Sequence, residues 1–317
     1  MSAIEVPFEE PIVELRRRLE ELEGYPEGVG RRKELDNLRS QLAKTTREVY
    51  GKLTRWEKTL VARHSERPYA LDYVSLLTDD WVEVHGDRAF ADDPAIVAGF
   101  ATFRGRSVAL IGHQKGRGTK ERIYRNFGQA RPEGYRKALR VMKLAEKFGL
   151  PVLTLVDTPG AYPGLGAEER GQAEAIARNL IEMASLRVPI VVTITGEGGS
   201  GGALALGVGD RVYMLEYAIY SVISPEGCAA ILWKDQQMRA EAAEALKLTA
   251  PDLLELGLID AIIPEPVGAA HTDSEDACGR VGDVIEKALD ELSKIPIEDL
   301  IRQRYERFRK LGAIQND

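Results

Sequence analysis

The 317-residue chain has few cysteines and no long apolar run. Its two cysteines, Cys228 and Cys278, are too few for a disulfide framework or for a zinc site of four cysteines. No apolar stretch approaches the ~20 residues that cross a bilayer, and the N-terminus lacks the pattern of a secretory signal. These absences predict a cytoplasmic protein with no membrane segment and no metal site of its own.

A general surplus of basic charge is also absent. The formal net charge is −7, which disfavours nucleic acid as the main partner because phosphate binding depends on basic residues. One window is an exception, since nine basic residues and only two acidic ones lie between Lys115 and Arg140. This window can seat an anionic small molecule or an acidic partner, or it can be a solvated face whose salt bridges form elsewhere in the fold.

Three segments are expected along the chain. Residues 1–60 carry apolar side chains at three- and four-residue steps, in two runs that Pro26 and several glycines separate, and this predicts a helical hairpin extension. Residues 61–295 alternate strands with helices, which favours one α/β domain. Residues 296–317 contain a basic amphipathic helix at 301–310, expected to be exposed or to face a partner.

The expected elements of the α/β domain follow from apolar runs and helical periodicity. The strands are expected at 96–103, 107–113, 151–156, 189–195, 211–215 and 219–223, and the helices at 132–148 and 168–186. Ser224 is a candidate helix cap, followed by Pro225 at the first helical position.

Two glycine-rich segments each follow an apolar strand. We call Asp157–Ala161 the first elbow and Gly196–Ala203 the second elbow. Each is expected to open a helix, whose first amides have no partner within the helix and therefore point at an anionic ligand. The alternative is that the glycines only permit close packing of a helix on a strand.

Three chemical interpretations compete for the second elbow. Gly196, Gly198 and Gly201 fit the dinucleotide fingerprint, with Glu216 as the acidic partner. The same elbow matches a nucleophile elbow, in which Ser200, Asp260 and His271 would form a hydrolase triad. No lysine follows the glycines, which excludes a P-loop.

The third interpretation needs no reactive side chain. The amides of Gly198 and Gly199 would stabilise an oxyanion, and a preorganised donor of this kind contributes ~3 to 4 kcal/mol to a transition state. An enzyme can therefore work here without a conspicuous catalytic side chain.

The motifs, taken together, resemble one family over nearly the whole chain. They include Asp157–Gln172, Gly196–Ala203, Tyr220–Cys228, Ile262–Pro266 and Gly112–Gly116. In these strings the chain is similar to the carboxyltransferase alpha subunits of bacterial acetyl-coenzyme A carboxylase. The resemblance implies a crotonase-like (ClpP/crotonase) α/β fold of repeated β-β-α units with an N-terminal helical hairpin extension.

The same resemblance implies a reaction and its partners. The carboxyl group of carboxybiotin, held on a separate biotin carboxyl carrier protein, would pass to acetyl-coenzyme A and give malonyl-coenzyme A for fatty acid synthesis. A beta subunit with a four-cysteine zinc ribbon would complete an alpha2-beta2 assembly, and a biotin carboxylase would consume ATP to charge the biotin. This chain would hold neither the biotin covalently nor a metal.

Site residues are expected from the resemblance as well. The amides of Gly198 and Gly199 would bind the ureido oxygen of biotin. Gly201 and Gly202 would shape the same turn, and Gly160 and Ala161 the neighbouring wall. Lys115 and Arg122 are candidates for the anionic parts of the substrates. A non-catalytic scaffold that only supports the beta subunit also stays open.

Overall fold

The computed structural model describes residues 6–24 and 31–312 and contains an eight-stranded mixed sheet in the order β1-β2-β3-β4-β5-β6-β8, with β7 paired to β5. The strands are β1 (Thr78–Glu83), β2 (Ile96–Phe103), β3 (Arg106–His113), β4 (Val152–Thr158), β5 (Ile190–Gly199), β6 (Arg211–Leu215), β7 (Ile219–Ser221) and β8 (Ala261–Ile263).

Helices make up most of the remaining described chain. The longer ones are α1 (Glu10–Gly24), α2 (Arg31–Tyr50), α3 (Arg55–Ala62), α4 (Ala70–Leu77), α6 (Pro132–Phe148), α8 (Gln172–Ser185), α10 (Pro225–Leu232), α11 (Arg239–Leu246), α13 (Ser274–Leu292) and α14 (Ile297–Lys310). The shorter ones are η1 (Pro7–Glu9), α5 (Gly118–Tyr124), η2 (Asn126–Gly128), α7 (Leu165–Glu169), α9 (Ser200–Leu204), η3 (Gln236–Met238) and α12 (Ala250–Glu255).

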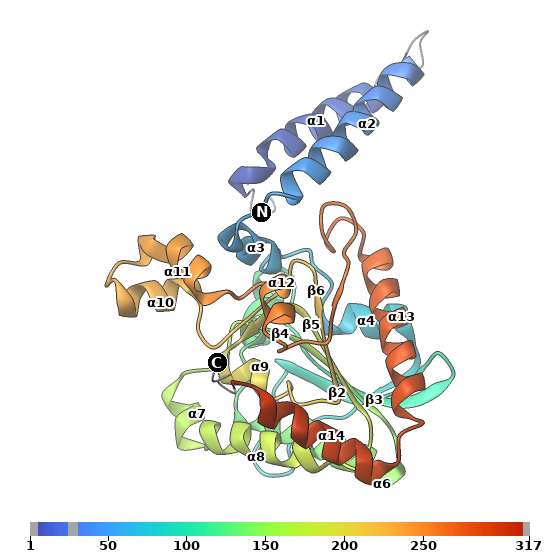
Figure 1. The fold of residues 1–317 in the computed structure, drawn as a ribbon, viewed down its shortest axis with the longest axis vertical. Helices are drawn as coiled ribbons and strands as arrows, with labels where there is room; N and C mark the ends of the chain where they lie inside the picture. The colour runs from blue at the N-terminus through green and yellow to red at the C-terminus, as the bar shows by residue number, and fades with distance from the viewer. Residues whose placement is uncertain (1–5, 25–30, 313–317) are drawn as a thin grey trace, which may run out of the picture.

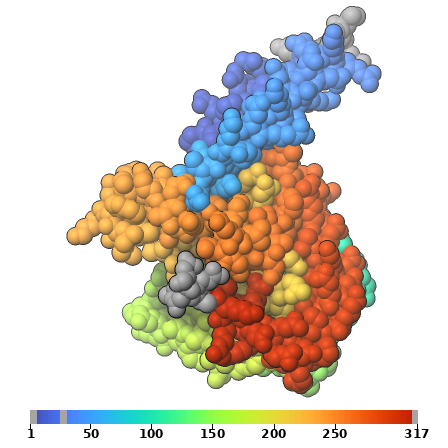
Figure 2. Space-filling model, viewed as in Figure 1, coloured from blue at the N-terminus to red at the C-terminus, as the bar shows by residue number. Residues whose placement is uncertain are grey.

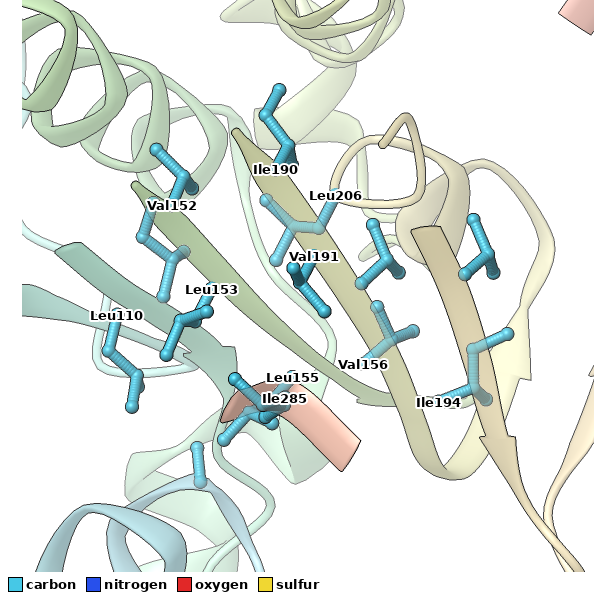
Figure 3. Packing of buried hydrophobic residues seen from close by; sticks show 14 of the residues in the cluster. Leu110, Val152, Leu153, Leu155, Val156, Ile190, Val191, Ile194, Leu206 and Ile285 are labelled. Atoms are coloured by element: carbon cyan, nitrogen blue, oxygen red, sulfur yellow. The ribbon is translucent and has the colours of Figure 1, made fainter. Parts of the chain in front are cut away.

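The central strands β3, β4, β5 and β6 run parallel and are buried on both faces. Alternate residues of β4 point to opposite faces, because side chains alternate along a strand. On one of these faces Leu155 lies near Ile285 of α13, as Figure 3 shows. This double burial explains why these strands read as continuous apolar runs.

Two helical layers cover the sheet. Helices α4 and α13 contact each other and pack on β3 and β5, and α6 packs on β2 and β3 and lies beside α8 (Figure 1). The hairpin of β2 and β3 turns tightly at Arg104 and Gly105, as its two apolar runs predicted. Helix α6 has its predicted bounds and ends at Gly149, whose φ of 67° is left-handed.

The N-terminal helices α1 and α2 lie side by side and project from the main body (Figures 1 and 2). They occupy the places where the apolar repeats predicted helices, and Pro26 lies outside the described residues. The base of the projection packs through Tyr50, whose ring meets that of Tyr217 edge-on. The boundaries expected at residues 60 and 295 stay predictions.

Two sequence-based expectations about helices were wrong. The helix expected at 168–186 is broken into α7 and α8, because Gly171 adopts a left-handed φ of 81° between them. The helix expected to be exposed at 301–310 starts earlier, at Ile297, and buries one arginine completely. Arg304 donates to both oxygens of Asp210, at 2.8 and 2.7 Å, so this side of α14 belongs to the interior.

Candidate functional site

The two elbows lie against each other because β4 and β5 are neighbours. Thr158, at the end of β4, pairs with Gly198 near the end of β5. A Cβ atom on Gly199 would overlap the carbonyl group of Pro159 and lie 2.8 Å from the carbonyl oxygen of Thr158. Only glycine therefore fits at residue 199 with both strand ends in this arrangement.

Gly202 repeats this close approach one turn further on. A Cβ atom there would lie 2.5 Å from the amide nitrogen of Ala161. Gly160 has a φ of 146°. Its amide donates to the hydroxyl of Thr158, and that hydroxyl donates to the carbonyl oxygen of Gly160 at 2.8 Å. The structure thus brings the predicted residues of both elbows together in one wall.

The turn of the second elbow lies later than the sequence predicted. Gly198 and Gly199 are the last residues of β5, in extended conformation, and pair with Tyr220 and Ser221 of β7. The chain turns at Ser200, whose φ is 52°. Helix α9 follows, but it has only five residues, and the first elbow leads into a loop before α7. The second elbow therefore opens a helix as expected, although a short one, whereas the expectation that the first elbow opens a helix was wrong.

A buried ionic cluster lies under both elbows. The ammonium of Lys115 is 2.7 Å from a carboxylate oxygen of Asp157 and 2.7 Å from one of Glu197. The Asp157 oxygen that faces Lys115 also accepts the backbone amide of Glu197 at 2.8 Å. Asp157 is the second-last residue of β4 and Glu197 precedes the glycine pair, so these contacts fix the two strand ends to each other.

The pKa values of the two carboxylates in the cluster shift in opposite directions. Burial raises the pKa of Asp157, and the attraction of Lys115 offsets this only in part. Burial also acts on Glu197, but Lys115 and Arg63 outweigh it and lower the pKa of that carboxyl. The two carboxylates likewise outweigh burial at Lys115 and raise its pKa, which keeps the ammonium charged.

Arg63, the residue that follows α3, extends the cluster to the start of α10. Its guanidinium lies 2.6 Å from Glu197 and also binds Glu226, in the first turn of α10. Ser224 caps that helix by accepting the amide of Gly227, as its position predicted. One set of ion pairs therefore connects the ends of β4 and β5 with the start of α10.

The two predicted anion-binding side chains lie in different surroundings. The side chain of Lys115 is 13 % exposed and forms ion pairs with Asp157 and Glu197, which favours a positioning role over contact with a ligand. Arg122 is exposed on α5, where its guanidinium lies 5.4 Å from the ring centre of Phe127. The structure does not bring Arg122 into the cluster.

An apolar cavity opens beside the second elbow. It has a volume of about 300 Å³ and begins at Ser200 and Gly201. Its far walls come from β7, α12 and the C-terminal helix, including Tyr220, Leu253 and Phe308. A flat, largely apolar ring can enter such a cavity from the bare backbone of the elbow.

The hydrolase triad does not form. Asp260 binds Arg307 and accepts the amide of Val212, and the ring of His271 stacks on that of His64 with centroids 3.8 Å apart. Neither side chain hydrogen-bonds to Ser200 within the described ranges. The required base and orienting group are therefore missing from the elbow.

The dinucleotide interpretation fails as well. Gly196 and Gly198 are strand residues, and the helix after them is too short to present the usual phosphate site. The carboxylate of Glu216 accepts the amide of Glu265 and has a structural role in the chain.

Sequence reasoning gave no role to Asp157, Glu197 or Arg63. One signal in the sequence could have pointed to them: each carboxylate lies at the end of a buried apolar strand, and a buried charge needs a partner. The identity of the partner could not be read from the sequence, because Glu197 is 40 residues from Asp157 and 82 from Lys115.

No group of His, Cys, Asp and Glu is arranged to hold a metal in residues 6–24 and 31–312, and no helix there is long and apolar enough to cross a membrane. Both cysteines are free and buried.

Solved structures with the same fold are carboxylases and related enzymes. Transcarboxylase 12S, with methylmalonyl-coenzyme A bound, has a TM-score of 0.58 and 24% identity, covering 72% of this chain and 42% of that one. A Pseudomonas malonate decarboxylase hetero-tetramer has a TM-score of 0.56 and 18% identity, covering 69% of this chain and 90% of that one. At these identities the likeness shows the fold, and it confirms the predicted crotonase-like α/β architecture.

The sequence matches are much stronger. The family described as "Acetyl co-enzyme A carboxylase carboxyltransferase-like" matches residues 5–312. The acetyl-coenzyme A carboxylase carboxyl transferase subunit alpha of Syntrophotalea carbinolica is 58% identical over 97% of this chain and 98% of its own length. That of Geobacter metallireducens is 56% identical over 98% of each chain. The chain therefore belongs to the acetyl-coenzyme A carboxylase carboxyltransferase family, among the alpha subunits.

Proposed function

We propose that this chain is the alpha subunit of a carboxyltransferase that moves a carboxyl group from carboxybiotin to acetyl-coenzyme A and forms malonyl-coenzyme A. The observation that carries the proposal is the match over almost the full length, at 58% identity, to a carboxyl transferase alpha subunit. The reaction would serve fatty acid synthesis, and carboxybiotin would arrive as a substrate on a separate carrier protein.

The glycine pair at the end of β5 is the proposed oxyanion site. Carboxybiotin supplies the carboxyl group, and loss of that group places negative charge on its ureido oxygen. The amides of Gly198 and Gly199 would donate to this oxygen. Close packing of Gly199 on Pro159 supports the assignment, because donors held in position before the substrate binds need no reorganisation during the reaction.

The surroundings of the elbow fit a biotin ring. The apolar cavity starts at Ser200 and Gly201, so an apolar bicycle could lie there with its polar edge toward the glycine amides. Gly202 would hold the turn closed against Gly160 and Ala161, which form the neighbouring wall. No histidine is needed as the base in this scheme, since the free biotin nitrogen would accept the proton from the acetyl group.

Lys115 would position the glycine pair and would not contact the substrate. Its ion pairs hold the ends of β4 and β5 together and thereby fix the glycine pair. Arg122 stays a candidate for contact with an anionic group, because it is exposed and its guanidinium carries no carboxylate partner within the described residues.

The partners are part of the proposal. An alpha subunit implies a beta subunit, which would contribute the zinc ribbon and the site for the acetyl group in an alpha2-beta2 assembly. A biotin carboxyl carrier protein and a biotin carboxylase would complete the system. The two buried cysteines of this chain cannot supply a four-cysteine zinc site, and this fits such a division of labour.

Reconstitution tests the function. Carboxyl transfer between malonyl-coenzyme A and biotin is measured with this chain alone, with a beta subunit alone, and with both. We expect turnover only in the mixture. If the beta subunit alone turned over as fast as the mixture, this chain would be only a scaffold. If none of the three assays showed turnover, the proposed reaction would be refuted.

The hydrolase alternative has its own control. Ser200→Ala should keep transfer activity within about tenfold, since no base activates this hydroxyl. Loss of all activity in a folded Ser200→Ala complex would indicate that Ser200 acts as a nucleophile.

A further inference from the structure

The nine basic residues between Lys115 and Arg140 differ in their partners. Five bind carboxylates within the protein: Lys115, Arg117, Arg125, Arg136 and Lys137. The other four have no carboxylate at ion-pair distance among the described residues: Lys120, Arg122, Arg131 and Arg140. Positive charge that the fold does not neutralise therefore remains on the surface.

Two of these cations lie beside exposed apolar side chains. Ile123 and Tyr124 of α5 are 63 and 65 % exposed, and Phe127 of η2 is 46 % exposed. Lys120 and Arg122 are exposed on the same short helix. We call these five residues the basic ridge.

The backbone holds Phe127 outward at a cost in strain. Asn126 and Phe127 both have left-handed backbone angles, with φ of 47° and 57°. Such angles cost a non-glycine residue of order 1–3 kcal/mol each and persist where the surroundings enforce them. The side chain of Asn126 fastens the turn by donating to the carbonyl oxygen of Gln129 at 2.7 Å. The direction in which the Phe127 side chain leaves the backbone is therefore set before any partner binds.

The ridge lies next to the proposed site. Gly128, the residue after Phe127, packs so closely on the ionic cluster that an added Cβ would lie 2.8 Å from Cγ of Lys115 and 3.3 Å from the carbonyl oxygen of Asp157. The cluster in turn fixes the glycine pair through Glu197. The ridge is therefore joined to the elbow through one segment, whose Gly128 packs on the cluster that holds the glycine pair.

We propose that the basic ridge docks an acidic surface of the protein that carries the biotin. This inference rests on the proposed function and identifies where its partner binds. Exposed cations beside rigid aromatic side chains are typical of protein interfaces, whereas small molecules bind in concave sites. Because the chain as a whole carries a charge of −7, a local basic surface also directs an acidic partner to this place.

A charge-reversal pair tests the ridge in the assembled alpha–beta complex. The variant is Lys120→Glu with Arg122→Glu, and the matched control is Lys287→Glu with Lys294→Glu, two exposed lysines in and after α13. Transfer is measured with two acceptors, free biotin and biotin on its carrier protein, and carrier binding is measured directly on immobilised carrier.

The ridge variant should bind the carrier about tenfold more weakly or worse, and raise KM for carrier-borne biotin by a similar factor. The loss should shrink as salt is raised, because salt screens the wild-type attraction. With free biotin, Lys120→Glu alone should keep kcat and KM at the wild-type level, because no contact with the small substrates is assigned to Lys120. Phe127→Ala should weaken carrier binding as well, with little change in salt dependence.

Several results would overturn the docking proposal. Unchanged carrier binding or an equal loss with free biotin would show that the ridge does not dock the carrier. A raised KM for the acyl-coenzyme A alone would make the ridge a site for that substrate, and dissociation of the alpha–beta complex would make it a subunit interface. Failure of the proposed function looks different: the wild-type complex would then transfer to neither acceptor, while direct binding still decides whether the ridge docks the carrier.

Discussion

Two glycines of the second elbow provide a matched pair. A Cβ atom on Gly199 would overlap Pro159, whereas one on Gly201 would lie 3.6 Å from Ile176, an ordinary contact. Gly199→Ala should therefore displace the end of β5 and lower kcat by ~10², since a shift of about 1 Å at a reacting site costs that much. Steady-state kinetics of the assembled complex measures the effect.

Gly201→Ala is the control, because it adds the same methyl group two residues away without a clash. We expect its kcat within about threefold of wild type. Equal activity of the two variants would show that the close packing of Gly199 has no part in turnover.

Two buried histidines make stability depend on pH. Burial, with help from Lys115, lowers the pKa of His113 from its ordinary value of 6.5 to about 3, and burial does the same for His271. A lowered pKa means that the folded state binds the proton more weakly than the unfolded state. The stabilising contribution is thus complete above the ordinary pKa and is lost as pH falls toward the folded value.

The expected slope is about 1.4 kcal/mol per pH unit for each histidine between about pH 6 and pH 4. His113→Leu should remove one such contribution, because leucine carries no group that titrates in this range. Urea unfolding across this range measures the slope. An identical slope in the variant would show that His113 is protonated in the folded protein.

At the scale of elements, ion pairs join the strand ends. Lys115→Met would leave Asp157 and Glu197 buried without their common cation, and should lower the free energy of unfolding by about 3–5 kcal/mol. Lys287→Met, at an exposed position of α13, should cost less than about 0.5 kcal/mol. Denaturant titration compares the two.

A double variant separates the cluster from simple packing. Adding Glu197→Gln to Lys115→Met removes one of the two carboxylates that Lys115 neutralises, so the combined loss should be smaller than the sum of the two single losses. Strict additivity would contradict the coupling that we derive from the distances.

The sequence predicted those elements whose signals are local. The hairpin of β2 and β3, the bounds of α6 and the capping of α10 by Ser224 depend on neighbouring residues only, and the structure confirms them. The residues of the two elbows were also located correctly along the chain. The family resemblance implied that Gly160 and Ala161 form the wall beside the second elbow, and the pairing of β4 with β5 brings the two elbows together.

The features that the sequence could not predict depend on contacts between distant segments. The glycines at the end of β5 disfavour a strand, and pairing with β4 and β7 overrides this preference. The partners of Glu197 come from the residue after α3, from the residues after β3 and from β4, so they depend on the sheet order. The roles of the site residues in binding stay predictions.

At the scale of the whole molecule, a buried arginine anchors the C-terminal helix. Arg304 binds Asp210 and donates to the carbonyl oxygens of Met183, Leu186 and Val188. Arg304→Leu should leave Asp210 charged and unpaired and cost about 3–5 kcal/mol. The same helix lines the apolar cavity through Phe308, so loosening it should also weaken biotin binding.

Thermal unfolding and KM for free biotin together test this anchor. Arg302→Leu is the control, because Arg302 lies on the same helix with its side chain 65 % exposed. If Arg304→Leu unfolded no earlier than Arg302→Leu, the buried pair would not anchor α14.

The central claim is that backbone amides at the end of β5 stabilise charge during carboxyl transfer. The most direct measurement replaces the amide of Gly199 by an ester, through incorporation of glycolic acid, which removes the N–H without adding a Cβ. An ester at Gly105, in the turn between β2 and β3, is the control. We predict that kcat of the assembled complex falls ~10² or more with the ester at residue 199 and stays unchanged with the control. Wild-type turnover by a folded complex with the ester at residue 199 would contradict the claim.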